Sequence, residues 1–127
     1  MVNKISEKVP FTKADIMMVL YKIANNDPSI DYFDNQAICK VANLFCTIWS
    51  QWIEIYNTEK RDMYLIYGDK LFYAGNSTFS YFDEVNNRVS AYLNISGEVT
   101  FIFVDTNGLV HTNDGQILFE LKRIEDW

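Results

Sequence analysis

The chain has 127 residues, 49% of them hydrophobic and 16% aromatic, which is enough apolar material to bury a core as a single domain over 1–127. Eleven basic and seventeen acidic side chains give a net charge of −6, which disfavours direct binding to nucleic acid and to anionic lipid. No stretch approaches the ~18 uncharged apolar residues of a membrane span, and charges interrupt residues 1–8, so we expect a cytoplasmic protein with no membrane contact.

A first helix is expected over 13–25. Thr12 is a good N-cap, and Asp15 three residues later can close a capping box with it. The helix should end before Pro28, because the residue that precedes a proline avoids the helical region. Its apolar stripe is formed by Ile16, Val19, Leu20 and Ile23.

A second, longer helix is expected to begin after an N-cap at Asp34 and to reach about Asn57. Apolar residues recur there at alternating spacings of three and four, as on one face of a helix. On such a helix Cys39 and Cys46 lie about 10 Å apart, which is too far for a disulfide, so we interpret both as small buried hydrophobic residues. The stripe is formed by Ile38, Val41, Phe45, Ile48, Trp52 and Ile55.

From Asp62 onward the apolar pattern is that of strands. A Gly-Asp pair at 68–69 has the composition of a two-residue hairpin turn between the runs 63–67 and 70–73. Residues 76–87 fit either a short helix or an irregular strand, and we favour the helix.

The C-terminal part is expected to form a meander of four strands. Asn107 and Gly108 both accept the positive φ of a type I′ turn, which is a strong signal for a hairpin. If these two residues form the whole loop, His111 lies opposite Val104. The four runs are 88–95, 99–106, 109–112 and 116–124.

The predicted fold class is therefore α+β, with two N-terminal helices, the second one long, packed on a curved antiparallel meander sheet. This order of elements resembles the cone-shaped folds of the nuclear-transport-factor and ketosteroid-isomerase superfamily. The resemblance implies a pocket between the long helix and the sheet. Core filling is the competing and favoured interpretation of the aromatic side chains. The candidate pocket residues are Trp49, Trp52, Tyr56, Tyr64, Tyr73, Tyr92 and His111.

No motif predicts a metal, a cofactor or a catalytic centre. The chain has a single histidine, His111, and its two cysteines lack the paired spacing of zinc ligands. Its five glycines are isolated in turns and form no phosphate-binding loop. His111 suits acid–base chemistry by residue type, but no motif places a nucleophile beside it, so we favour an ordinary strand histidine. We expect a protein that is not an enzyme.

The acidic side chains are concentrated in the C-terminal half, where residues 61–127 hold five basic and ten acidic residues. Several of these acids lie on or beside consecutive predicted strands, and the terminal tryptophan can serve as an exposed anchor. An acidic patch with an aromatic anchor would occlude a basic cleft such as that of a nuclease. The predicted partner-binding residues are Asp105, Asp114, Glu120, Glu125, Asp126 and Trp127.

The leading hypothesis is a non-enzymatic acidic binding protein that neutralises a basic protein partner, in the manner of a bacterial toxin-immunity protein that inhibits a nuclease toxin. The same features, a short acidic chain without catalytic motifs, also fit a phage-encoded inhibitor of a host nucleic-acid-binding protein. One competing hypothesis is a pocket protein that binds or isomerises a small apolar ligand. Another is a homodimer with a structural role.

Overall fold

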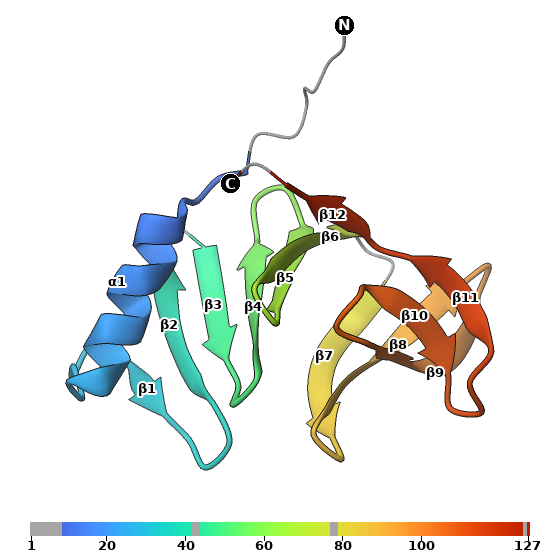
Figure 1. The fold of residues 1–127 in the computed structure, drawn as a ribbon, viewed down its shortest axis with the longest axis horizontal. Helices are drawn as coiled ribbons and strands as arrows, with labels where there is room; N and C mark the ends of the chain where they lie inside the picture. Colours follow the sequence, from blue (N-terminus) through green and yellow to red (C-terminus); the bar gives the residue numbers. More distant parts are fainter. Residues whose placement is uncertain (1–8, 42–43, 77–78, 126) are drawn as a thin grey trace, which may run out of the picture.

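The computed structural model describes residues 9–41, 44–76, 79–125 and 127 (Figure 1). Within them the chain forms one helix, α1 (Lys13–Ala24), and twelve strands in two antiparallel sheets. Sheet A consists, in spatial order, of β1 (Asp31–Tyr32), β2 (Ala37–Val41), β3 (Leu44–Ile48), β4 (Trp52–Asn57), β5 (Asp62–Tyr67), β6 (Lys70–Asn76) and β12 (Lys122–Ile124). Sheet B consists of β11 (Ile117–Glu120), β10 (Leu109–Thr112), β9 (Glu98–Val104), β8 (Arg88–Ile95) and β7 (Phe79–Val85).

The first predicted helix is confirmed as α1. Its capping box forms as expected, because the Asp15 backbone N–H donates to Thr12 Oγ1 at 3.1 Å and the Thr12 backbone N–H donates to Asp15 Oδ2 at 2.9 Å. The helix ends at Ala24, one residue before the predicted boundary. Ile16 and Val19 are buried, and they attach α1 to sheet A.

The predicted long helix over 34–57 is wrong, because this segment forms the strands β2, β3 and β4. Two short hairpins turn the chain, so that Lys40 pairs with Phe45 and Ile48 pairs with Ile53. The segment is rich in β-branched and aromatic residues, which favour strands. These strands carry apolar or aromatic side chains on both faces, so helical spacings also occur in them without a helix. The described chain is mostly β, which corrects the expected α+β class.

Sheet A lies in the middle of three layers. Figure 1 shows α1 over β2 at one side of sheet A and sheet B at the side of β5 and β6. Alternate residues of one strand therefore enter different cores: Tyr64 faces α1, whereas Met63 and Leu65 face sheet B. The core under α1 contains Phe11, Ile16, Val19, Val41, Leu44, Cys46, Ile53, Ile55, Tyr64 and Leu71. The core between the sheets contains Trp52, Met63, Leu65, Phe72, Phe79, Phe82, Val89, Leu93, Ile102, Val104 and Val110, among others.

The predicted hairpin around 68–69 is confirmed, with Tyr67 paired to Lys70 and Gly68 at a φ of 61°. The favoured short helix over 76–87 is wrong, because β7 occupies this segment. The irregular strand that was its alternative is confirmed, since the pairing of β7 with β8 shifts register between Phe79 and Phe82.

The C-terminal meander forms, but its last two connections differ from the prediction. The loop between β9 and β10 is longer than two residues, so Val110 lies opposite Val104 and His111 lies opposite Phe103. The run 116–124 divides at Leu121. Its first part, β11, stays in sheet B, whereas β12 joins sheet A beside β6.

The resemblance to the cone-shaped superfamily is wrong, because it depended on the long helix that sheet A replaces. The pocket between that helix and a curved sheet therefore has no counterpart. As for the membrane, the described part of the chain contains no helix with the length and apolar character needed to cross one.

Candidate functional site

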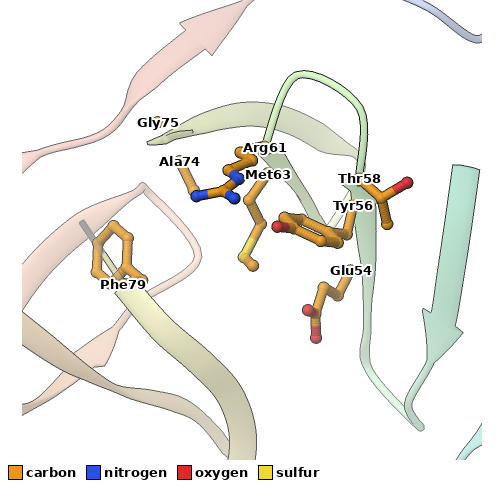
Figure 2. Close-up of a pocket in the computed structure, with 8 residues that line it drawn as sticks. All are labelled: Glu54, Tyr56, Thr58, Arg61, Met63, Ala74, Gly75 and Phe79. Atoms are coloured by element: carbon orange, nitrogen blue, oxygen red, sulfur yellow. The ribbon is translucent and has the colours of Figure 1, made fainter. Parts of the chain in front are cut away.

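A cleft of about 530 Å³ lies between the two sheets, where β4, β5 and β6 of sheet A meet the start of β7 in sheet B. Figure 2 shows the side chains of Glu54, Tyr56, Met63 and Arg61 directed toward the side of the cleft on which Phe79 lies. The cleft is lined by Glu54, Tyr56, Thr58, Arg61, Met63, Ala74, Gly75 and Phe79.

Strand β4 positions Glu54, the one carboxylate among the described residues that line this cleft. Trp52, Glu54 and Tyr56 alternate along β4 and share the face of sheet A that is turned toward sheet B. The cross-strand neighbours of Glu54 are Thr47 on β3 and Leu65 on β5. Pairing on both sides fixes the position of β4, so the carboxylate is held by a rigid element rather than by a loop.

Sheet B covers this face of sheet A only in part. It packs over β5 and β6, whereas Phe45 of β3, on the same face as Tyr56, remains 45% exposed. Glu54 lies at the border between the covered and the open parts and is half-buried. The cleft is therefore open to a partner from the side of β3.

Burial raises the pKa of the Glu54 carboxyl to about 7, because the charged form loses hydration in the cleft. Within the described residues, no hydrogen bond or ion pair offsets this loss. The carboxyl therefore changes its charge near neutral pH, which is unusual for a glutamate. Packing alone would favour an apolar side chain at this position, so the glutamate points to a functional role.

Arg61 brings the second charge to the cleft. It lies in the connection between β4 and β5, has an exposed side chain and adopts a φ of 59°, in the left-handed region that residues other than glycine rarely occupy. Burial is the cause of the raised Glu54 pKa, and no ion pair joins Glu54 to Arg61 in the described part of the chain. The cleft thus offers an acceptor and a donor separated by apolar side chains.

Two stacked tryptophans lie on the same face of sheet A as Glu54, outside the lining of the cleft. Trp52 is 2% exposed and stacks on Trp49, with ring centroids 5.0 Å apart and ring planes inclined by 14°. Phe82 of β7 meets Trp52 edge-on at 6.1 Å. Both indole Nε1 atoms are buried and have no hydrogen-bond partner in the described part of the chain.

The structure separates the aromatic residues that the sequence proposed for a pocket. Tyr56 lines the cleft, and the two tryptophans lie next to it. Tyr64 and Tyr73 project from the opposite face of sheet A and pack in the core under α1. Tyr92 and His111 lie on the outer face of sheet B, where the His111 ring stacks against Phe103 at 6.1 Å.

The predicted acidic partner-binding residues of sheet B lie at its two ends. Asp105 accepts backbone hydrogen bonds from Asn107 and Leu109 in the loop before β10, whereas Asp114 accepts the Thr112 hydroxyl in the loop after it. Glu120 pairs with Leu109 and so lies at the Asp105 end. Asp105 and Glu120 therefore lie at one end of sheet B, and Asp114 lies at the other.

The C-terminal members of the set lie on sheet A and beside α1. Glu125 stands 4.0 Å from Arg123 in an exposed ion pair on the sheet edge. Trp127 packs edge-on against Phe11 at 5.7 Å and lies under the ammonium group of Lys13 at 5.5 Å. Trp127 therefore contributes to the core under α1. Asp126 lies outside the described residues.

Sequence reasoning missed Glu54 because the helix predicted over 34–57 left this residue outside its apolar stripe. In a strand pattern, the run from Trp52 to Tyr56 shows one carboxylate between two aromatic residues on the same face. That isolated acid was the available signal. Among the described residues, no group of three or more His, Cys, Asp or Glu side chains is arranged to hold a metal ion.

Comparison with known proteins identified no relative of this chain. No protein-family model, no curated protein and no solved structure matches it. The function is therefore inferred from the residues of the cleft.

Proposed function

We propose that the chain is a non-enzymatic acidic binding protein that neutralises a basic protein partner, and that the cleft at Glu54 receives a lysine side chain of that partner. The half-buried Glu54 carboxylate supports this proposal most directly, because no cation or hydrogen-bond donor among the described residues compensates it. An ammonium group beside the carboxylate would replace the lost hydration and stabilise its charged form.

The walls of the cleft suit the rest of a lysine side chain. The rings of Tyr56 and Phe79 attract a cation through their faces, and the Met63 thioether adapts to an aliphatic stem. A volume of about 530 Å³ accommodates one side chain together with adjoining backbone. Arg61 can donate a hydrogen bond to a backbone carbonyl of the entering segment.

The net charge of −6 supports a basic partner at longer range, because it speeds the approach of positively charged surfaces. The pair of acids at Asp105 and Glu120 adds to this field without lining the cleft. A toxin-immunity protein with a basic nuclease toxin as its partner is the proposed biological role within this class.

The test uses capped pentapeptides of sequence Gly-Gly-Lys-Gly-Gly, with norleucine in place of lysine as the control that lacks only the ammonium group. Binding to the full chain is followed by NMR chemical shifts. Glu54→Gln removes the charge of the cleft with little change in shape. Glu59→Gln is the matched control, since Glu59 is exposed in the β4–β5 connection and its loss changes the net charge equally.

The lysine peptide is expected to bind, and the norleucine peptide is not. Glu54→Gln should weaken binding by about tenfold or more, the usual effect of losing a hydrogen bond to a charged group, while Glu59→Gln should leave it within about twofold. Equal losses of peptide affinity in the two variants would show that binding depends on net charge and not on the cleft. If lysine amide alone bound as tightly as the pentapeptide, the cleft would be a small-molecule site.

A further inference from the structure

Cys39 and Cys46 lie directly opposite each other on β2 and β3. The sequence-based prediction that about 10 Å of helix separates them is therefore wrong. Both side chains point to the α1 face of sheet A, where Cys46 is completely buried and Cys39 is half-buried. The two side chains are therefore adjacent, and both cysteines are free thiols.

The backbone geometry allows a disulfide between these two residues. Directly opposite residues of an antiparallel pair have Cα atoms about 4.5–5.5 Å apart, which falls inside the range of about 4.4–6.8 Å found in disulfides. Because both Cβ atoms project from the same face, the sulfur atoms can join without a change in strand register.

Only one of the two thiols can be reached from outside. Cys39 lines a cavity of about 370 Å³ between the end of α1 and the strands β1 and β2, and Lys22 lines the same cavity. The hydrogen bond from Cys46 and the charge of Lys22 lower the pKa of the Cys39 thiol. The same hydrogen bond, together with burial, raises the pKa of the Cys46 thiol. The pair is therefore asymmetric.

We propose that Cys39 and Cys46 form a redox-active dithiol that reacts reversibly with low-molecular-weight disulfides entering the cavity at Lys22. Cys39 is the attacking thiolate, and Cys46 is the resolving thiol. This site is separate from the cleft at Glu54, because the two cavities share no lining residue and both cysteines project from the α1 face of sheet A.

The reaction has two exchange steps. In the first, the Cys39 thiolate attacks one sulfur of the small disulfide, whose S–S bond breaks and releases one thiolate. In the second, the Cys46 sulfur attacks the Cys39 sulfur of this mixed disulfide and releases the other thiolate. The two cysteine protons pass to the two released thiolates, so the cysteines are oxidised to one disulfide and the small disulfide is reduced to two thiols.

The opposite pKa directions of the two paired thiols favour this order of steps. While Cys39 is a thiolate, its interaction with Cys46 raises the pKa of the Cys46 thiol, which therefore stays protonated. Once Cys39 is part of a mixed disulfide, that negative charge is gone and the main cause of the raised Cys46 pKa is removed. Cys46 can then lose its proton next to the sulfur that it must attack.

The experiment treats the folded full chain with oxidised glutathione, followed by acid quenching, intact-mass measurement and peptide mapping. The unsubstituted chain should lose two hydrogen atoms and carry no glutathione, with the new bond mapped to Cys39 and Cys46. Cys46→Ser should accumulate glutathione on Cys39. Cys39→Ser should react at least about tenfold more slowly than the unsubstituted chain, because its remaining thiol is buried.

Far-ultraviolet circular dichroism confirms that each variant is folded, and Cys46→Ala replaces Cys46→Ser if the hydroxyl is not tolerated in the core. The unsubstituted chain alone shows whether an internal disulfide forms between Cys39 and Cys46. Stable glutathione on Cys39 with no internal disulfide would overturn the proposal, as would equal reaction rates of Cys39→Ser and Cys46→Ser.

Discussion

Gly108, in the loop between β9 and β10, lies against the ring of Phe72 in sheet A: a Cβ atom added to Gly108 would stand 2.5 Å from Cε1 of Phe72. Gly108 also adopts a φ of 82°, in the left-handed region. Its carbonyl accepts the backbone N–H of Leu121 at 2.8 Å, at the point where the chain leaves sheet B. The absence of a side chain here therefore serves both the turn and the contact between the sheets.

Gly108→Ala should lower the free energy of unfolding by roughly 2–4 kcal/mol, because it adds backbone strain to a clash with a buried ring. Gly97→Ala is the control, since Gly97 has a φ of 84° but nothing within 4 Å of its added Cβ. The control should cost only about 1 kcal/mol. Urea unfolding compares the two variants, and equal losses would rule out the contact with Phe72 as the cause.

Glu54 should make the chain less stable as the pH rises. Its folded-state pKa of about 7 lies above the ordinary 4.5, so the folded state binds this proton more tightly than the unfolded state does. The stabilisation from this proton is present below about pH 4.5 and is lost as the pH rises through 7. Because Glu54 is partly solvated, we expect a loss of about 1–2 kcal/mol between pH 5 and pH 8.

Glu54→Gln should remove most of this slope and should be more stable than the unsubstituted chain at about pH 8. Urea unfolding at several pH values measures both effects. A slope that is unchanged in Glu54→Gln would assign the pH dependence to another group.

Trp127→Ala distinguishes a core role from the role of partner anchor that the sequence suggested. Removing the ring contact with Phe11 should cost about 1–2 kcal/mol of stability, because Trp127 is partly buried. Binding of the lysine pentapeptide should not change. Glu125→Gln is the control, since its exposed pair with Arg123 at 4.0 Å should contribute less than about 1 kcal/mol. Unchanged stability together with weaker binding would restore the anchor hypothesis.

The capping box gives a local test of α1. Thr12→Ala removes the acceptor for the Asp15 backbone N–H, so it should lower the free energy of unfolding by about 1 kcal/mol. Thr12→Ser keeps the hydroxyl and should stay within about 0.5 kcal/mol. Thermal unfolding monitored by circular dichroism measures both variants, and a similar loss in both would mean that the cap hydrogen bond does not stabilise the helix.

Signals that act within a few residues were sufficient to predict local structure. Thr12 and Asp15 marked the start of α1, and the glycine at 68 marked the hairpin between β5 and β6. In both places the chemistry of the turn or cap is satisfied by neighbouring residues alone. The predicted strand Arg88–Ile95 coincides with β8.

The remaining elements depend on contacts that sequence spacing does not contain. Residues from Ile38 to Ile55 satisfy the spacing of a helix and also that of strands with apolar side chains on both faces. Only the pairing of these strands with each other and their packing against other elements decide between the two patterns. The division at Leu121 likewise depends on β6, which is distant in the sequence. Both Glu54 and the pairing of Cys39 with Cys46 were missed for this reason.

The return of β12 to sheet A makes sheet B an insertion between two adjacent strands. β6 and β12 are antiparallel neighbours, with Lys122 opposite Tyr73, so a short turn could join them directly. Evolution or protein engineering could then replace residues 79–120 as a cassette without altering the strand pairing of sheet A. Such an exchange would provide a new cover for the aromatic face of sheet A and change which molecules reach its carboxylate.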